Sequence, residues 1–82
     1  MNVLSSNRAQ KELHQLPDQL ARTILKHIIS LSTNPYPSNC KKLQGQGNWR
    51  LRVGSFRVIY FVDKKLKEIT ILRVADRKTI YR

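Results

Sequence analysis

Residues 48–60 constrain the fold most strongly, because they have the pattern of two short strands joined by a tight turn. In the first strand apolar residues alternate with arginines, which is the period-two pattern of a half-buried strand. The second strand is rich in β-branched and aromatic residues. Gly54 occupies the first of the two central turn positions, which suits a type II′ turn. The segment therefore predicts a β-hairpin over residues 48–62.

A two-residue turn also fixes which residues face each other across the hairpin. The expected pairs are Val53 with Phe56, Arg52 with Arg57, Leu51 with Val58, and Arg50 with Ile59. Directly opposed residues lie on the same side of a sheet, so the three arginines share one face. Like charges that oppose each other are destabilising, and no acidic residue stands beside these three. We therefore expect an anionic partner on this face.

The remaining apolar patterns supply two helices and one more long strand. The expected elements are a brief edge strand at residues 1–4, helices at about 7–15 and 18–32, the hairpin, and a strand at about 67–74. Pro17 fits the first turn of the second helix. The 82 residues form one domain, 1–82. The order β-α-α-β-β-β predicts an α+β fold with two helices packed on one face of a small antiparallel sheet.

The alternation along the hairpin divides its side chains between the helices and the arginine face. The set expected to face the helices is Leu51, Val53, Phe56, Val58 and Tyr60. The same register places Ile59 and Phe61 beside the arginines. These two residues then pack under loops or against a partner; otherwise the register is wrong.

The positive charge is concentrated in the second half of the chain. Residues 1–40 carry four basic and two acidic side chains (+2), and residues 41–82 carry twelve basic and three acidic ones (+9), which together give +11. A basic patch on a small domain indicates nucleic-acid binding. A basic surface without a ligand, or a docking site for an acidic protein, is the alternative. The single cysteine favours a reducing compartment, and the lack of an apolar run as long as a membrane span favours the cytoplasm.

Several catalytic classes lack the residues they require. No histidine, cysteine or carboxylate set has metal-ligand spacing, and no serine–histidine–aspartate triad, phosphate-binding glycine loop or carboxylate pair is evident. No cofactor is expected. The remaining candidates are Arg50, Arg52, Arg57, Arg77 and Tyr81. Guanidinium groups bind phosphate and stabilise a phosphorane, and a tyrosine stacks on a base or transfers a proton. These residues either cleave RNA through its own 2′-hydroxyl or merely bind phosphate.

Four segments, in order, resemble the RelE/ParE superfamily of toxins from type II toxin–antitoxin pairs. They are Arg8-Ala9-x-Lys11-x-Leu13-x-x-Leu16-Pro17, Leu31-x-x-Asn34-Pro35, Lys42-Leu43-x-Gly45 with the hairpin Trp49–Tyr60, and Val74-Ala75-Asp76-Arg77-x-x-x-Tyr81. The resemblance covers nearly the whole chain, and the hairpin is its most specific part. RelE-like members cut messenger RNA in the ribosomal A site without metal, so the resemblance implies this activity and this fold.

The resemblance also implies residue roles. Arg57 matches the arginine that contacts the scissile phosphate, and Arg50 and Arg52 match basic residues that stabilise the transition state. Arg77 matches an arginine that assists the leaving 5′-oxygen, and Tyr81 matches a tyrosine that stacks on the base or helps proton transfer. Further RNA contacts are expected at Lys41, Lys42, Arg73, Lys78 and Arg82. Where the best-known nuclease branch has lysines, this chain has Arg50 and Arg52. Arginine, with a pKa of about 12.5–13.8, is a poor general base, so the base is not assigned.

Two other functions stay open at this point. ParE-like members of the superfamily poison DNA gyrase and have no nuclease activity, and a non-catalytic RNA-binding module, which composition alone favours, is the other alternative. The spacing of Arg77 and Tyr81 beside the hairpin arginines favours the RelE branch. The implied partners are an acidic, partly disordered antitoxin, the ribosome with messenger RNA in its A site, and promoter DNA bound by the toxin–antitoxin complex.

Overall fold

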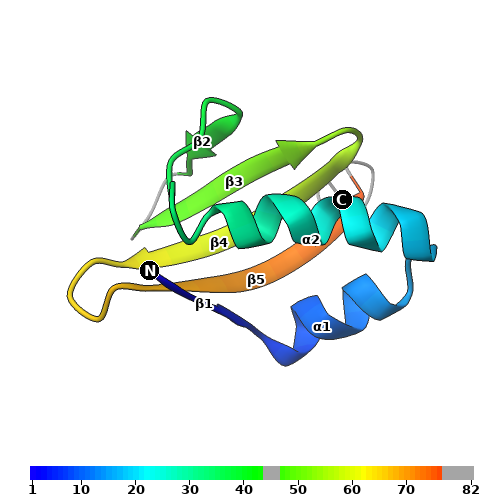
Figure 1. Ribbon diagram of the computed structural model, residues 1–82, viewed down its shortest axis with the longest axis horizontal. Coiled ribbons are helices and arrows are strands. Elements are labelled where there is room, and N and C mark those ends of the chain that lie inside the picture. Colours follow the sequence, from blue (N-terminus) through cyan, green and yellow to red (C-terminus); the bar gives the residue numbers. More distant parts are fainter. Residues whose placement is uncertain (44–46, 77–82) are drawn as a thin grey trace.

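The computed structural model describes residues 1–43 and 47–76, which form one sheet and two helices (Figure 1). The elements are β1 (Asn2–Ser5), α1 (Asn7–His14), α2 (Asp18–Ser30), β2 (Cys40–Lys42), β3 (Asn48–Val53), β4 (Phe56–Asp63) and β5 (Glu68–Asp76). The strands lie in the order β1-β5-β4-β3-β2. Both helices pack on one face of this sheet. The predicted α+β architecture with two N-terminal helices on one face is confirmed.

The sheet differs from the prediction in two respects. The segment Cys40–Lys42, where no strand was predicted, forms a fifth strand that pairs with β3. It is too short to show a period-two pattern, and a proline-rich loop precedes it. The second difference is that β1 runs parallel to β5, so the sheet is mixed and not purely antiparallel. The helices end one and two residues before their predicted ends, and β5 continues to Asp76.

Local signals explain where the helices begin. The Ser6 hydroxyl accepts a hydrogen bond from the Ala9 N–H at 3.1 Å and caps α1. Pro17 precedes α2, and Asp18 places a carboxylate in its first turn, where the helix dipole stabilises negative charge. Among the described residues, neither helix is long and apolar enough to cross a membrane.

The core lies between the two helices and the sheet. Its fully buried side chains include Ile24 and Leu31 from α2 and its end, and Leu51, Val58 and Tyr60 from the hairpin. Four of the five hairpin side chains expected to face the helices are buried, and Phe56 is partly buried against the same core. This burial confirms the predicted hairpin faces.

Phe61 and Ile59 lie on the opposite face, and both are partly buried. Phe61 packs under the chain at Gly47, where an added Cβ would lie 3.0 Å from the Phe61 ring. Gly47 also has φ +81°, which other residues rarely adopt. The first of the three explanations is therefore correct for Phe61, because it packs under a loop and the register is as predicted.

Candidate functional site

The hairpin brings three arginines to one face of the sheet. Arg52 pairs directly with Arg57, and Arg50 pairs with Ile59, as the two-residue turn predicted. Gly54 has φ +59°, the sign that the first central position of a type II′ turn requires. The backbone thus fixes which face of the sheet the three arginine side chains share.

Strand β2 adds a fourth cation and closes one side of the site. Lys41 pairs with Arg50 across the β2–β3 ladder, so both side chains point to the arginine face. Asn39, just before β2, holds this part of the chain against β3, because its Nδ2 donates to the Arg52 carbonyl at 2.8 Å and its own carbonyl accepts from the Arg52 N–H at 3.1 Å. The result is a hollow of about 300 Å³, called the arginine hollow below. It is lined by Ser38, Asn39, Cys40, Lys41, Arg50, Arg52 and Arg57.

The arginine hollow is strongly electropositive. None of the seven residues that line it carries a carboxylate, and four of them are cations. Arg57 is only 6% exposed, Arg50 is partly buried, and Arg52 and Lys41 are exposed. The site therefore offers one buried arginine and three more accessible cations. Such a set of donors suits a phosphate group whose charge increases during a reaction.

Two of the predicted RNA contacts lie outside the arginine hollow. Lys42 pairs with Trp49, so its side chain points to the other face of the sheet. Arg73 forms an ion pair with Glu12 of α1, with 2.9 Å between Nη2 and Oε2, and Glu12 Oε1 also accepts from the Val74 N–H at 2.8 Å. Glu12 thereby holds β5 against α1, and its position far away in sequence gave no signal for this role. Lys42 and Arg73 stay predictions as RNA contacts.

Arg77, Lys78, Tyr81 and Arg82 lie outside the described residues. The described chain ends at Asp76, which pairs with Phe56, and Ala75 pairs with Arg57. The predicted roles of Arg77, Lys78, Tyr81 and Arg82 in catalysis and RNA binding stay predictions.

Ser38, Asn39 and Cys40 were not predicted to line the site. They join it because β2 forms, and the sequence shows no pattern for that strand.

Tyr60 lies on the opposite face, and burial raises its pKa above the ordinary tyrosine value, with a hydrogen bond to Cys40 as a smaller contribution. Tyr60 is thus neutral at physiological pH and donates to the Pro35 carbonyl at 2.7 Å. Within residues 1–43 and 47–76, no three histidine, cysteine or acidic side chains gather as metal ligands would.

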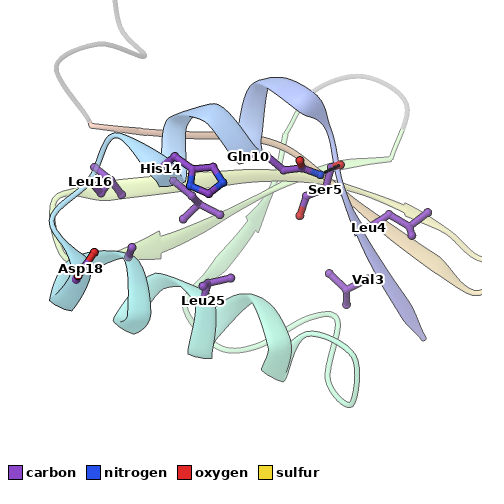
Figure 2. A pocket seen from close by; sticks show the side chains of 10 residues that line it. Val3, Leu4, Ser5, Gln10, His14, Leu16, Asp18 and Leu25 are labelled. Carbon is purple, nitrogen blue, oxygen red and sulfur yellow. Dashed lines mark hydrogen bonds between the residues drawn. The ribbon is translucent and has the colours of Figure 1, made fainter.

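A second and larger hollow, of about 580 Å³, lies between α1, α2 and β1 (Figure 2). We call it the helix groove. Its lining residues are Val3, Leu4, Ser5, Gln10, Leu13, His14, Leu16, Asp18, Ala21 and Leu25. Most of them are apolar, and neither lysine nor arginine is among them. Leu4 and Leu25, from opposite sides of the groove, are 49% and 41% exposed. This surface suits an apolar segment and not a nucleic acid.

Comparisons with known proteins give one consistent family. Residues 3–81 match the model of the ParE toxin of the type II toxin–antitoxin system parDE. A relative named RelE1 from Methanocaldococcus jannaschii is 33% identical over 99% of this chain and 94% of its own, and toxin RelG from Mycobacterium tuberculosis is 31% identical over 98% and 94%.

Solved structures agree with these relatives. A chain of the archaeal RelE–RelB complex from Pyrococcus horikoshii superimposes with a TM-score of 0.84 and 34% identity, and the match covers 93% of each chain. The family model spans nearly the whole sequence, and the relatives match it end to end. The chain therefore belongs to the ParE toxin family, within the RelE/ParE superfamily of type II toxin–antitoxin toxins.

Proposed function

We propose that this toxin is a ribosome-dependent, metal-independent messenger-RNA endonuclease that inhibits translation in the cytoplasm. The arginine hollow is the observation that carries the proposal. It combines a buried arginine with three further cations, and none of its seven described lining residues carries a carboxylate that would repel a phosphate. The relatives named RelE1 and RelG and the RelE chain of the archaeal complex support the nuclease branch.

The proposed reaction uses the RNA's own 2′-hydroxyl as the nucleophile. The 2′-oxygen attacks the adjacent phosphorus, the bond to the 5′-oxygen breaks, and a proton moves from the 2′-hydroxyl to the leaving 5′-oxygen. The products are a 2′,3′-cyclic phosphate and a 5′-hydroxyl. We expect Arg57 to contact the scissile phosphate, while Arg50 and Arg52 stabilise the added charge of the phosphorane. Arg77 and Tyr81 are proposed to assist the leaving group and stack on the base or transfer the proton.

The proposed protein partner is an acidic, partly disordered antitoxin that folds on the toxin. Solved neighbours include complexes of RelE with RelB, which supports a partner of this class. Acidic residues of the antitoxin would cover the arginine hollow, and its apolar residues would occupy the helix groove. The toxin–antitoxin complex would also bind promoter DNA.

The matching family model favours a second candidate function, poisoning of DNA gyrase without nuclease activity, because that model describes ParE toxins. In this case the basic face would serve to bind gyrase or its DNA. A non-catalytic RNA-binding module is the third reading of the same charges.

One experiment separates the three functions. Purified protein is added to translating ribosomes, cleavage is mapped by primer extension, and gyrase supercoiling is measured in parallel. The nuclease proposal predicts A-site cuts that Arg57→Ala, Arg77→Ala and Tyr81→Phe reduce. Inhibited supercoiling without cuts would favour the gyrase function. Salt-dependent RNA binding with neither effect would leave the binding module. If all three variants cut at the full rate, the assignment of the site is wrong.

A further inference from the structure

Tyr36 and Trp49 form an aromatic pair at the edge of the sheet, outside the arginine hollow. Their ring centroids lie 4.6 Å apart, and the ring planes are inclined by 50°. Trp49 packs partly against the core, whereas Tyr36 is 38% exposed. Because Tyr36 keeps this much of its surface accessible, the pair presents an aromatic surface to solvent. We propose that this pair is a stacking platform for a base of the single-stranded RNA that the arginine hollow holds.

The loop that carries Tyr36 is held in place by several contacts. The Tyr36 N–H donates to Asn34 Oδ1 at 3.2 Å, and the Tyr60 hydroxyl donates to the Pro35 carbonyl at 2.7 Å. Pro35 and Pro37 flank Tyr36 and restrict the backbone on both sides. An aromatic ring that is already fixed loses little conformational entropy when a base binds. The loop thus has the preorganisation that a binding platform needs.

Strand β2 connects the platform to the arginine hollow. Lys42 pairs with Trp49 and Lys41 pairs with Arg50, so this edge strand sends one lysine to each face of the sheet. Both lysines are exposed. An RNA strand that crosses the β2 edge would therefore pass from the arginine hollow to the aromatic pair with a phosphate-binding cation on each side.

Cations beside aromatic rings are the usual means of binding single-stranded RNA, whose unstacked bases stack on the rings. Stacking tolerates every base because every base has a π-face. The platform would thus position the nucleotide next to the scissile phosphate without reading its identity. This inference rests on the RNA binding that the proposed function includes, because it requires RNA in the arginine hollow, but it does not require cleavage.

Trp49 is the only tryptophan of the chain, so its fluorescence reports directly on stacking. The full chain is titrated at low salt with a short single-stranded RNA and with an abasic oligonucleotide of the same length. We expect the RNA to quench Trp49 and the abasic strand to bind without quenching. Tyr36→Leu should weaken RNA binding by about tenfold, the effect of one lost stacking contact, and leave binding of the abasic strand unchanged. Tyr36→Phe, which keeps the ring, should bind like the unaltered protein.

The other possible outcomes show whether the stacking platform or the nuclease proposal is wrong. Equal affinity of Tyr36→Leu and Tyr36→Phe for RNA, or RNA binding without quenching, would overturn the platform and leave the nuclease proposal intact. Failure to bind either oligonucleotide would also overturn it. Quenching that depends on Tyr36, together with no cleavage on ribosomes, would support the platform and refute the nuclease proposal. Thermal unfolding of each variant verifies the fold, which an exposed side chain such as Tyr36 should not affect.

Discussion

The arginine hollow and the helix groove occupy opposite edges of the same sheet and have opposite chemistry. The arginine hollow adjoins β2 and is lined by four cations, whereas the helix groove adjoins β1 and has neither lysine nor arginine in its lining. The first surface has the charge that a phosphate chain requires, and the second is mostly apolar. Under the proposed function, the arginine hollow would act on RNA and the helix groove would bind the antitoxin, so the two activities would use separate surfaces.

The largest expected effect is on catalysis by Arg57. Arg57→Gln removes a charged donor from the arginine hollow, so we expect A-site cleavage to slow by about 100-fold. Arg57→Lys keeps the charge but loses the planar guanidinium group, so its cleavage rate should lie between those of Arg57→Gln and the unaltered protein. Single-turnover cleavage on ribosomes measures both. Because Arg57 is buried, urea unfolding of each variant is the control, and an unchanged rate for Arg57→Gln would contradict its role.

The helix groove is tested by a charge placed among its apolar residues. Leu25→Asp buries an unpaired carboxylate when an apolar segment docks, so antitoxin affinity should fall by about tenfold or more. Cleavage of RNA in the absence of antitoxin should not change. Leu66→Asp alters another exposed leucine, at the β4–β5 turn, and should affect neither property. Titration calorimetry with the cognate antitoxin gives the affinities, and equal loss in both variants would argue against the groove.

Arg73, one of the predicted RNA contacts, is held by Glu12 as part of the scaffold. Glu12→Ala leaves the Val74 N–H without its acceptor and breaks the ion pair with Arg73, so the free energy of unfolding should fall by about 1–2 kcal/mol. Glu12→Gln keeps an acceptor oxygen and should cost less. Urea denaturation measures both changes. If the two variants were equally stable, the hydrogen bond to Val74 would contribute nothing.

The smallest effect concerns the salt dependence of RNA binding. Each phosphate contact contributes about 0.7 to the slope of log affinity against log salt for a single strand. Arg52→Gln should therefore lower the slope by about 0.7, whereas Lys26→Gln on α2 should leave it unchanged. Fluorescence titrations over a series of salt concentrations give the slopes. Equal slopes for the two variants would show that the arginine hollow binds RNA no better than the rest of the surface.

The hairpin could be predicted in detail from sequence, because alternation and a two-residue turn together determine the register. The faces of Arg50, Arg52 and Arg57 followed from that register alone. Strand β2 could not be predicted, since it has three residues and exists only because β3 offers an edge to pair with. Because β2 was not predicted, the contributions of Asn39 and Cys40 to the arginine hollow were not predicted either.

Long-range pairing accounts for the other differences. Arg73 lies in a β-forming stretch, and nothing in that stretch indicates that Glu12, 61 residues earlier, is its partner. The parallel direction of β1 likewise depends on where the helices return the chain. Local patterns define strands and helices, but contacts between distant residues decide which charged side chains remain available for a ligand.

The most direct test of the proposed chemistry compares two messenger RNAs on translating ribosomes. They are identical except that one carries a 2′-deoxynucleotide immediately 5′ of the A-site phosphate that is cut. If the 2′-hydroxyl is the nucleophile in the arginine hollow, the toxin will cut the all-ribose messenger and leave a 2′,3′-cyclic phosphate, and it will not cut the deoxy-substituted one. Equal cutting of both messengers, or cutting of neither, would contradict the account.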